Sequence, residues 1–177
     1  MDNNFLEIEK KVLKERAKIL ALPVIKENSK SEERNILLFS ALNQNMAIYL
    51  SSIEAVTQIT DIVSIPHTPK HIPGVIRRKG STIALVNLRF FFYPDTENLI
   101  DEDYAIIVKA KNKIFALQVN DIKGVIPLLT SQIKKIPDNF DSAIAPYVSG
   151  ITSDDTVILN IDKMVTSEGF GTTGIEN

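Results

Sequence analysis

The residues that most often carry chemistry are few in this chain and lie apart. His67 and His71 are its only histidines, and they flank Pro69 in a segment without helical periodicity. A metal site needs several Cys, His or carboxylate ligands, whereas the chain has no Cys and no dense acidic cluster beside these two histidines. The sequence therefore predicts neither a metal site nor a cofactor.

A glycine-rich segment near residue 170 has the wrong surroundings for phosphate binding. Gly169, Gly171 and Gly174 are spaced like a phosphate loop, but no predicted strand leads into them and no predicted helix follows. Ser, Asp and Glu residues are scattered without a nucleophile motif. Since catalytic groups also converge from distant segments, these features weaken an enzyme interpretation without excluding it, and we expect a protein that is not an enzyme.

The densest basic cluster is formed by Arg77, Arg78 and Lys79, which end at Gly80. One interpretation is the solvated end of a strand. The other is an anchor for acidic residues of a partner protein, because complementary charge guides association.

An aromatic run occupies residues 90–93, directly before Pro94. On a strand, neighbouring side chains point to opposite faces. Either Phe90 and Phe92 or Phe91 and Tyr93 would then point outward and form an apolar patch suited to a partner. The alternative is a strand end that the N-terminal helix buries on both sides.

Composition excludes several classes of partner. The chain has 177 residues and a net charge of −2, with acids and bases interspersed, so it lacks the basic field that drives binding to nucleic acid. No apolar run approaches the length of about 20 residues that spans a membrane, and the absence of Cys agrees with a reducing compartment. We expect a cytoplasmic protein with no nucleic-acid partner and no direct membrane insertion.

The most informative pattern is an internal repeat. Residues 39–56 align without a gap with residues 108–125, and apolar residues recur at matching places. Farther on, Gly74 matches Gly150, and the run 85–88 matches 158–161. Two copies are too few for a solenoid, so the repeat predicts two similar small β subdomains packed together, with function in the seam or on the outer faces. The alternative is chance similarity between two hairpins.

One long stretch, residues 4–22, has helical periodicity. Phe5 and Val12 lie seven residues apart, as do Leu6 and Leu13, with charged residues between them. This apolar stripe needs a cover. The cover is either the β body or, as the second possibility, a helix of a partner or of another copy of the chain.

Beyond a polar linker the pattern changes to short segments rich in Ile, Val and Leu, with turn residues between them. Turns are expected at Asn43-Gln44 and Lys111-Asn112, and short helices at 130–134 and 161–166. Many short antiparallel strands favour small barrels or a sandwich. The predicted strands are 36–42, 46–50, 53–59, 74–79, 82–87, 104–110, 113–119, 121–126, 147–152 and 156–161.

The expected domain organisation follows from these segments. It comprises a helix and linker over residues 1–35, a β body over 36–166 and a flexible tail over 167–177. The β body is expected to divide into subdomains at roughly 36–100 and 101–166.

The order of the segments resembles the CheW-like domain family of bacterial chemotaxis coupling proteins. The resemblance spans residues 36–166. It implies a mainly β fold, in which two pseudo-symmetric five-stranded SH3-like β-barrels pack together, and such a fold would explain the repeat. The segments that carry it are Ala47-Ile48-x-Leu50-x-x-Ile53, Ile72-x-Gly74-Val75, Leu85-Val86-Asn87-Leu88-Arg89, Ala116-Leu117-x-Val119, Val148-x-Gly150-Ile151 and Ile158-Leu159-x-Ile161.

The resemblance implies a non-enzymatic signalling adaptor that links the cytoplasmic tips of chemoreceptors to the histidine kinase CheA. One surface would accept the CheW-like regulatory domain of the kinase, and an apolar groove would accept an amphipathic receptor helix. Matching family positions place the receptor groove at Ile53, Ala55, Gly74, Lys79 and Val86. A further candidate partner patch consists of Arg77, Arg78, Phe91 and Tyr93.

Two positions depart from the family pattern. The family usually has an acid at the place of Ala55 and an arginine at the place of Lys79. We infer that these residues pair in the family, because a buried charge that loses its partner is costly, and that both have changed together here. The departure suggests a specialised set of partners.

Two other interpretations remain open. The first is a related scaffold for a kinase pathway outside chemotaxis, which would share the fold and the binding mode. The second is a two-barrel β enzyme or ligand-binding protein with its site between the barrels. A deep polar pocket with charged groups of perturbed pKa would favour the second, whereas a shallow apolar groove would favour the adaptor.

Overall fold

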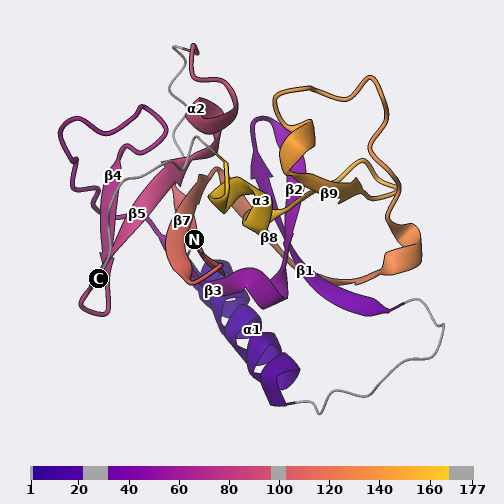
Figure 1. Ribbon diagram of the computed structural model, residues 1–177. Helices are drawn as coiled ribbons and strands as arrows, with labels where there is room; N and C mark the ends of the chain where they lie inside the picture. The colour runs from indigo at the N-terminus through magenta and orange to yellow at the C-terminus, as the bar shows by residue number, and fades with distance from the viewer. Residues whose placement is uncertain (1, 22–31, 97–102, 168–177) are drawn as a thin grey trace.

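The computed structural model describes residues 2–21, 32–96 and 103–167 (Figure 1). Within them, short strands surround a central core, and the long N-terminal helix lies against one side (Figure 1). Most of the expected linker and nearly all of the expected tail lie outside the described residues, at 22–31 and 168–177.

All ten predicted strands are present in the described residues, and each overlaps its predicted range. The predicted helices over 4–22, 130–134 and 161–166 correspond to α1 (Asp2–Ala21), the 3-10 turn η2 (Thr130–Gln132) and α3 (Ile161–Val165). The strands are β1 (Glu33–Ala41), β2 (Gln44–Tyr49), β3 (Ile53–Gln58), β4 (Gly74–Arg78), β5 (Ser81–Asn87), β6 (Tyr104–Ala110), β7 (Lys113–Val119), β8 (Asp121–Leu129), β9 (Val148–Ile151) and β10 (Val157–Leu159). The helices are α1 (Asp2–Ala21), α2 (Leu88–Phe92) and α3 (Ile161–Val165), with 3-10 turns η1 (Leu50–Ser52), η2 (Thr130–Gln132) and η3 (Ala145–Tyr147).

In the described residues the strands form two five-stranded sheets. Sheet A has the order β8-β1-β2-β10-β9, and sheet B has the order β3-β6-β7-β5-β4. Each strand of the first repeat, β1 to β5, has a counterpart in the second repeat, β6 to β10. When every strand of sheet B is replaced by its counterpart, the strand order of sheet A results. The two sheets therefore have the same topology, as the sequence repeat predicts.

The sheets do not follow the expected division at residue 100. Sheet A joins β1 and β2 to β8, β9 and β10, whereas sheet B joins β3, β4 and β5 to β6 and β7. The sheets combine strands of both repeats because β1 of the first repeat pairs with β8 of the second. These two strands run antiparallel, from Glu33 opposite Leu129 to Ser40 opposite Asp121. Each repeat thus places its first two strands in one sheet and its last three in the other. The division into 36–100 and 101–166 splits both sheets.

Matching tight turns close the first hairpin of each repeat. Leu42 and Asn43 have φ angles of 57° and 61°, and Lys111 and Asn112 have φ angles of 46° and 65°. Two successive residues with positive φ form the turn whose twist suits a two-residue hairpin, and Asn tolerates this conformation well. The second turn lies where it was predicted, and the first lies one residue earlier than Asn43-Gln44.

The main core lies between the two sheets and takes side chains from both. Leu37 and Ile48 of sheet A contribute to the same buried cluster as Ile106 and Leu117 of sheet B. The opposite faces of the strands cover smaller clusters, such as the one that contains Ile36 and a second one in sheet B. Because many strands are buried on both faces, they read as nearly continuous apolar runs.

Two asparagines begin the short helices that follow β5 and β10. Oδ1 of Asn87 accepts a hydrogen bond from the N–H of Phe90 at 3.1 Å, and Oδ1 of Asn160 accepts one from the N–H of Lys163 at 3.0 Å. Both are N-caps, which satisfy a free backbone donor. The expectation of a strand through the aromatic run 90–93 is therefore wrong, because Asn87 starts helix α2 there.

The matching glycines allow close approach of backbone in each repeat. A Cβ atom at Gly74 would lie 2.3 Å from the carbonyl oxygen of Val63, and one at Gly150 would lie 2.3 Å from Cγ2 of Ile133. In both repeats an extended loop segment forms a β-bridge beside the glycine. Glycine is required because only it leaves room for this segment.

Helix α1 docks on the β body, which confirms the first of the two expectations for its apolar stripe. Val12 is fully buried in the central core, and the Phe5 ring lies 5.0 Å from the Tyr104 ring between centroids. The neighbouring column remains open, since Leu6 and Leu13 are 49% and 45% exposed. The helix therefore uses only part of its apolar stripe for docking.

Two ion pairs flank this contact. Arg16 donates hydrogen bonds to both carboxylate oxygens of Glu54 on β3, at 2.9 and 2.7 Å, and Arg78 at the end of β4 lies 3.4 Å from the carboxylate of Glu9. The hydrogen bond and charge of Arg16 lower the pKa of Glu54 below its usual range. Both pairs lie at the partly exposed edges of the helix contact.

We predict that Gly74→Ala destabilises the protein more than Gly150→Ala. At Gly74 the severe clash is with the backbone carbonyl oxygen of Val63, which cannot yield without displacing the bridge, whereas at Gly150 it is with a side-chain methyl group of Ile133 and the Lys134 carbonyl oxygen lies farther away, at 3.0 Å. We expect Gly74→Ala to lower the free energy of unfolding by about 2–3 kcal/mol and Gly150→Ala by about 1 kcal/mol. Denaturant unfolding of both variants measures this, and equal losses would contradict the predicted packing.

We predict that acid weakens the docking of α1 on the β body. A carboxylate with a lower pKa in the docked state favours docking above its free pKa of about 4.3 and loses that contribution as the pH falls through the docked value. The anisotropy of a dye on Ala17→Cys, an exposed position in a chain without Cys, should therefore fall between about pH 5 and pH 3. The same step in a Glu54→Gln variant would show that another group is responsible.

Candidate functional site

The five residues predicted for the receptor groove lie on sheet B or its β4–β5 turn, but they do not form an open groove. Ile53 and Val86 are fully buried in the central core. Ala55 is fully buried in the cluster inside sheet B, and Gly74 is buried at the start of β4. Only Lys79 is exposed. Apart from Lys79, these residues shape the sheet from within.

The two positions that depart from the family pattern have contrasting surroundings. Lys79 and Gly80 form the turn between β4 and β5, with φ angles of 46° and 81°, and Lys79 is exposed to solvent. Ala55 lies among apolar neighbours that include Ile76 and Ile83. In this chain an acid at position 55 would bring a carboxylate into an apolar cluster, so the small apolar residue fits its site.

The second predicted patch is divided between two places. Arg77 and Arg78 lie at the turn end of β4, and Arg78 is engaged by Glu9 of α1. Phe91 and Tyr93 lie beyond the opposite end of β5, on and just after α2 (Figure 1). The four residues therefore do not share one surface.

The aromatic residues of α2 serve as internal packing. The Phe91 ring lies 5.1 Å from the Tyr147 ring and 5.7 Å from the His71 ring, both in edge-on geometry. The Tyr93 hydroxyl donates a hydrogen bond to the carboxylate of Asp141, and burial together with this bond raises the pKa of Tyr93 to about 12. Both residues are half-buried, so the expected outward patch is absent from this helix.

The two histidines lie in different settings. His67 is exposed, while His71 is half-buried. Within the described residues, no group of three or more His, Asp or Glu side chains is placed to hold a metal ion.

Across residues 2–21, 32–96 and 103–167, no helix combines the length and the apolar character that crossing a membrane requires.

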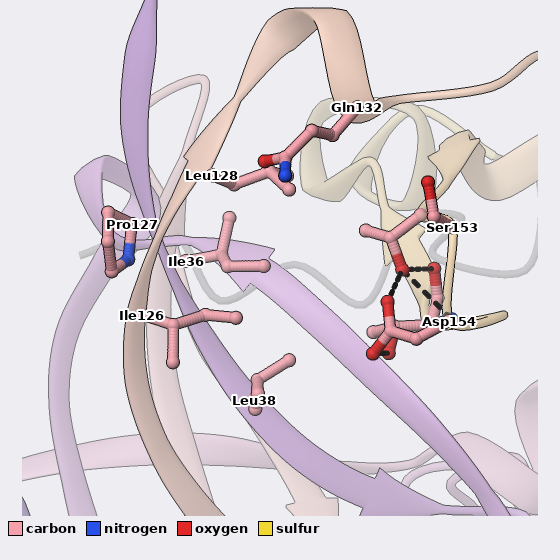
Figure 2. Close-up of a pocket in the computed structure, with 10 residues that line it drawn as sticks. Ile36, Leu38, Ile126, Pro127, Leu128, Gln132, Ser153 and Asp154 are labelled. Carbon is pink, nitrogen blue, oxygen red and sulfur yellow. Dashed lines mark hydrogen bonds between the residues drawn. The ribbon is translucent and has the colours of Figure 1, made fainter.

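A small pocket opens on sheet A, between the strands β1 and β8 and the turn that joins β9 to β10. Figure 2 shows Ile36, Leu38 and Ile126 projecting toward the space that Asp154 and Ser153 face from the other side. Its volume is about 150 Å³. The strand side is apolar and the turn side is polar, which is suited to an apolar side chain with a polar neighbour.

The polar side chains that line one side of the pocket form hydrogen bonds with one another. Thr152 and Thr156 are buried, and both hydroxyls donate to the carboxylate of Asp154. These bonds lower the pKa of Asp154. An ionised carboxylate held by its own turn is a poor candidate for acid or base catalysis near neutral pH.

The repeat shows what is unusual about this pocket. Thr152 and Thr156 correspond by the alignment to Ile76 and Ile83, which are buried in the cluster inside sheet B. Two isoleucines close the inside of sheet B, whereas two threonines and a turn carboxylate leave a pocket in sheet A. The two sheets therefore offer different surfaces despite their shared topology.

An exposed apolar segment lies beside β4, the edge strand of sheet B. Ile62, Val63 and Ile65 are 40%, 46% and 37% exposed. Val63 exchanges two backbone hydrogen bonds of 2.9 Å with Val75 of β4, so the segment is held on the sheet. An exposed apolar strip held on the edge of a sheet is typical of a protein-binding surface.

The corresponding segment of the second repeat is basic. Ile62-Val63-Ser64-Ile65-Pro66 matches Ile133-Lys134-Lys135-Ile136-Pro137, and Lys134 forms the equivalent β-bridge with Ile151. Its outward positions are lysines, which commonly protect an edge strand from unwanted pairing. Both segments lie between the gapless alignment and the matching glycine of their repeat, so the aligned residues themselves do not show this contrast.

Comparison with known proteins gives a family match and several similar proteins. The model of the CheW-like domain matches residues 35–169. The chemotaxis protein CheW of Klebsiella aerogenes is 20% identical over 138 residues, which cover 76% of this chain and 83% of that protein. The chemotaxis protein CheW of Treponema pallidum is also 20% identical, over 144 residues that cover 77% of this chain and 85% of that protein.

A solved structure has the same fold. The scaffolding protein TtCheW from Thermoanaerobacter tengcongensis superimposes with a TM-score of 0.67 at 23% sequence identity, covering 82% of this chain and 96% of that chain. The similarity confirms the predicted mainly β fold with two packed barrels, and α1 is the predicted N-terminal helix.

We predict that Ala55→Glu destabilises the fold strongly. The new carboxylate would lie in the apolar cluster of sheet B without a counter-charge, which should lower the free energy of unfolding by more than about 3 kcal/mol. Thr57→Glu adds the same charge at a half-buried position of the same strand and should cost about 1 kcal/mol or less. Thermal unfolding compares the two, and similar losses would contradict the burial assigned to Ala55.

Proposed function

The chain belongs to the CheW-like domain family, and on this premise we propose that it is a non-enzymatic adaptor that couples chemoreceptors to the histidine kinase CheA in bacterial chemotaxis. The observation that carries the proposal is the family match over most of the chain, together with curated relatives that are chemotaxis proteins CheW. We further propose a cytoplasmic location, in which the protein reaches the membrane only through receptor arrays.

The surfaces of the described residues support binding over catalysis. The pocket on sheet A has an apolar strand side and a carboxylate already bonded by two threonines. Its chemistry suits an apolar side chain of a partner better than a reacting substrate. This favours the adaptor over the two-barrel enzyme that the sequence left open.

We propose the strip Ile62, Val63 and Ile65 as the surface for the regulatory domain of the kinase. The strip is apolar, exposed and fixed to the edge of sheet B by the bridge to Val75. The kinase domain is expected to have the same fold, so its outer strands can pack against this edge. The basic segment at Lys134 would disfavour the same contact on sheet A. The kinase domain would therefore bind at the edge of sheet B and not at the equivalent edge of sheet A.

We propose that the receptor helix contacts the outer side of β3 and the β4–β5 turn. Ile53, Ala55 and Val86 are buried and would act by shaping this surface. The residue between the first two, Glu54, and the exposed Arg77 and Lys79 supply the outward groups. An acid on β3, with one base at the end of β4 and one in the β4–β5 turn, would orient an amphipathic helix that carries complementary charges.

An adaptor does not need two tight interfaces. When receptors and kinases are arranged in an array, each additional contact is effectively intramolecular and strengthens the others. Modest contacts through the strip and the turn would then suffice.

We predict that Val63→Lys, which copies the residue of the second repeat, weakens binding to the CheW-like regulatory domain of CheA from the same organism. Loss of a central apolar contact and gain of a charge should reduce affinity by about 10-fold or more. Calorimetric titration measures this. Ile114→Lys is the matched control, because Ile114 is 49% exposed on β7, away from the strip. Equal affinity of Val63→Lys and the wild type would remove the strip from the kinase interface.

A further inference from the structure

We propose that α1 is an internal ligand of a helix-binding seat formed by β3, β8 and η1, and that it limits access of a partner's amphipathic helix to that seat. The proposal concerns a regulatory contact within this chain. It rests on the proposed adaptor function only for the identity of the partner helix.

The seat is defined by the helix that already occupies it. Helix α1 makes its main contacts with β3, β8 and η1, where the chain crosses from sheet A to sheet B. Val12 is fully buried there, and Phe5 and Ile8 pack against the same core cluster. Apolar anchors spaced three and four residues apart are the pattern by which a groove binds an amphipathic helix.

Charged groups on both sides of the seat set its preference. Glu54 of β3 accepts two hydrogen bonds from Arg16, and Arg78 of β4 lies 3.4 Å from Glu9. The seat thus favours a helix with an acid near its first apolar anchors and an arginine one turn after the last anchor. A partner helix with this arrangement would match α1.

The contact that holds α1 on the β body is limited. Its second apolar column is about half exposed at Leu6 and Leu13. The Arg16 and Glu54 side chains remain 22% and 31% exposed, and partly exposed ion pairs contribute little to stability because water screens them. Attachment to the same chain raises the effective concentration of α1, so a modest contact is enough to hold the helix without making it permanent.

Occupation of the seat has a consequence for partner binding. Glu54 lies between Ile53 and Ala55, two of the residues assigned to the receptor surface, and Arg16 covers its carboxylate. The apparent affinity of an external helix falls in proportion to the fraction of molecules with an open seat. If α1 is docked in about nine molecules of ten, an external helix binds about tenfold more weakly than to an open seat.

The test uses the full chain and a fluorescent peptide with the sequence of residues 2–21. Arg16→Glu in the full chain places two acids opposite each other and should release the tethered helix. We expect the labelled peptide to bind this variant about tenfold more tightly than the wild type. Fluorescence anisotropy gives both affinities, and circular dichroism verifies that the variant is folded.

Two controls separate the seat from a general charge effect. Lys18→Glu changes the same charge on an exposed side chain that forms an ion pair with Glu15 of the same helix, and should leave peptide affinity at the wild-type level. In the double variant Arg16→Glu/Glu54→Arg the internal pair is restored with reversed charges. The wild-type peptide should then bind no better than it does to the wild-type chain.

The outcomes distinguish this inference from the proposed function. If the peptide bound the wild type and Arg16→Glu with equal affinity, or bound neither, the proposal that α1 blocks a helix-binding seat would be contradicted. If the peptide binds Arg16→Glu as expected, a helical peptide from the tip of a chemoreceptor of the same organism is added as a competitor. Displacement supports the receptor as the external ligand. A lack of displacement would leave the seat established and would contradict the receptor contact of the proposed function.

Discussion

The structure depends on the exchange of strands between two equivalent repeats. Each repeat places its first two strands in one sheet and its last three in the other, and the paired strands β1 and β8 join the two halves along nearly their whole length. The core between the sheets takes side chains from both repeats. Neither repeat can complete a sheet alone, so the two halves must fold and move as one body, which gives an adaptor fixed distances between its surfaces.

The two sheets differ where the symmetry of the repeats is broken. The same bridge position is Val63 beside sheet B and Lys134 beside sheet A. The same interior positions are isoleucines in sheet B and threonines in sheet A, where a pocket remains. Helix α1 adds a further difference, because it covers the crossing into sheet B at η1. A symmetric scaffold thereby offers non-equivalent surfaces, which is what a protein with two different partners requires.

Strands, repeat and family were predictable because they depend on local patterns and their order. The aromatic run reads as a continuation of the strand before it, yet most of it lies in helix α2. The signal for the helix is Asn87, whose side chain caps it. The exchange of strands was not predictable, since both sheet arrangements bury the same apolar runs. The burial of Ile53, Ala55 and Val86 also required the structure, because family positions carry residue identity but not exposure.

An adaptor of this kind must hold a kinase domain and a receptor on one molecule at the same time. Sedimentation velocity of the protein mixed with the regulatory domain of CheA and a soluble chemoreceptor fragment from the same organism tests it most directly. We expect one complex that contains all three components and that loses the kinase domain alone when Val63 is replaced by lysine. Separate binary complexes that exclude one another, or no complex with a folded protein, would contradict it.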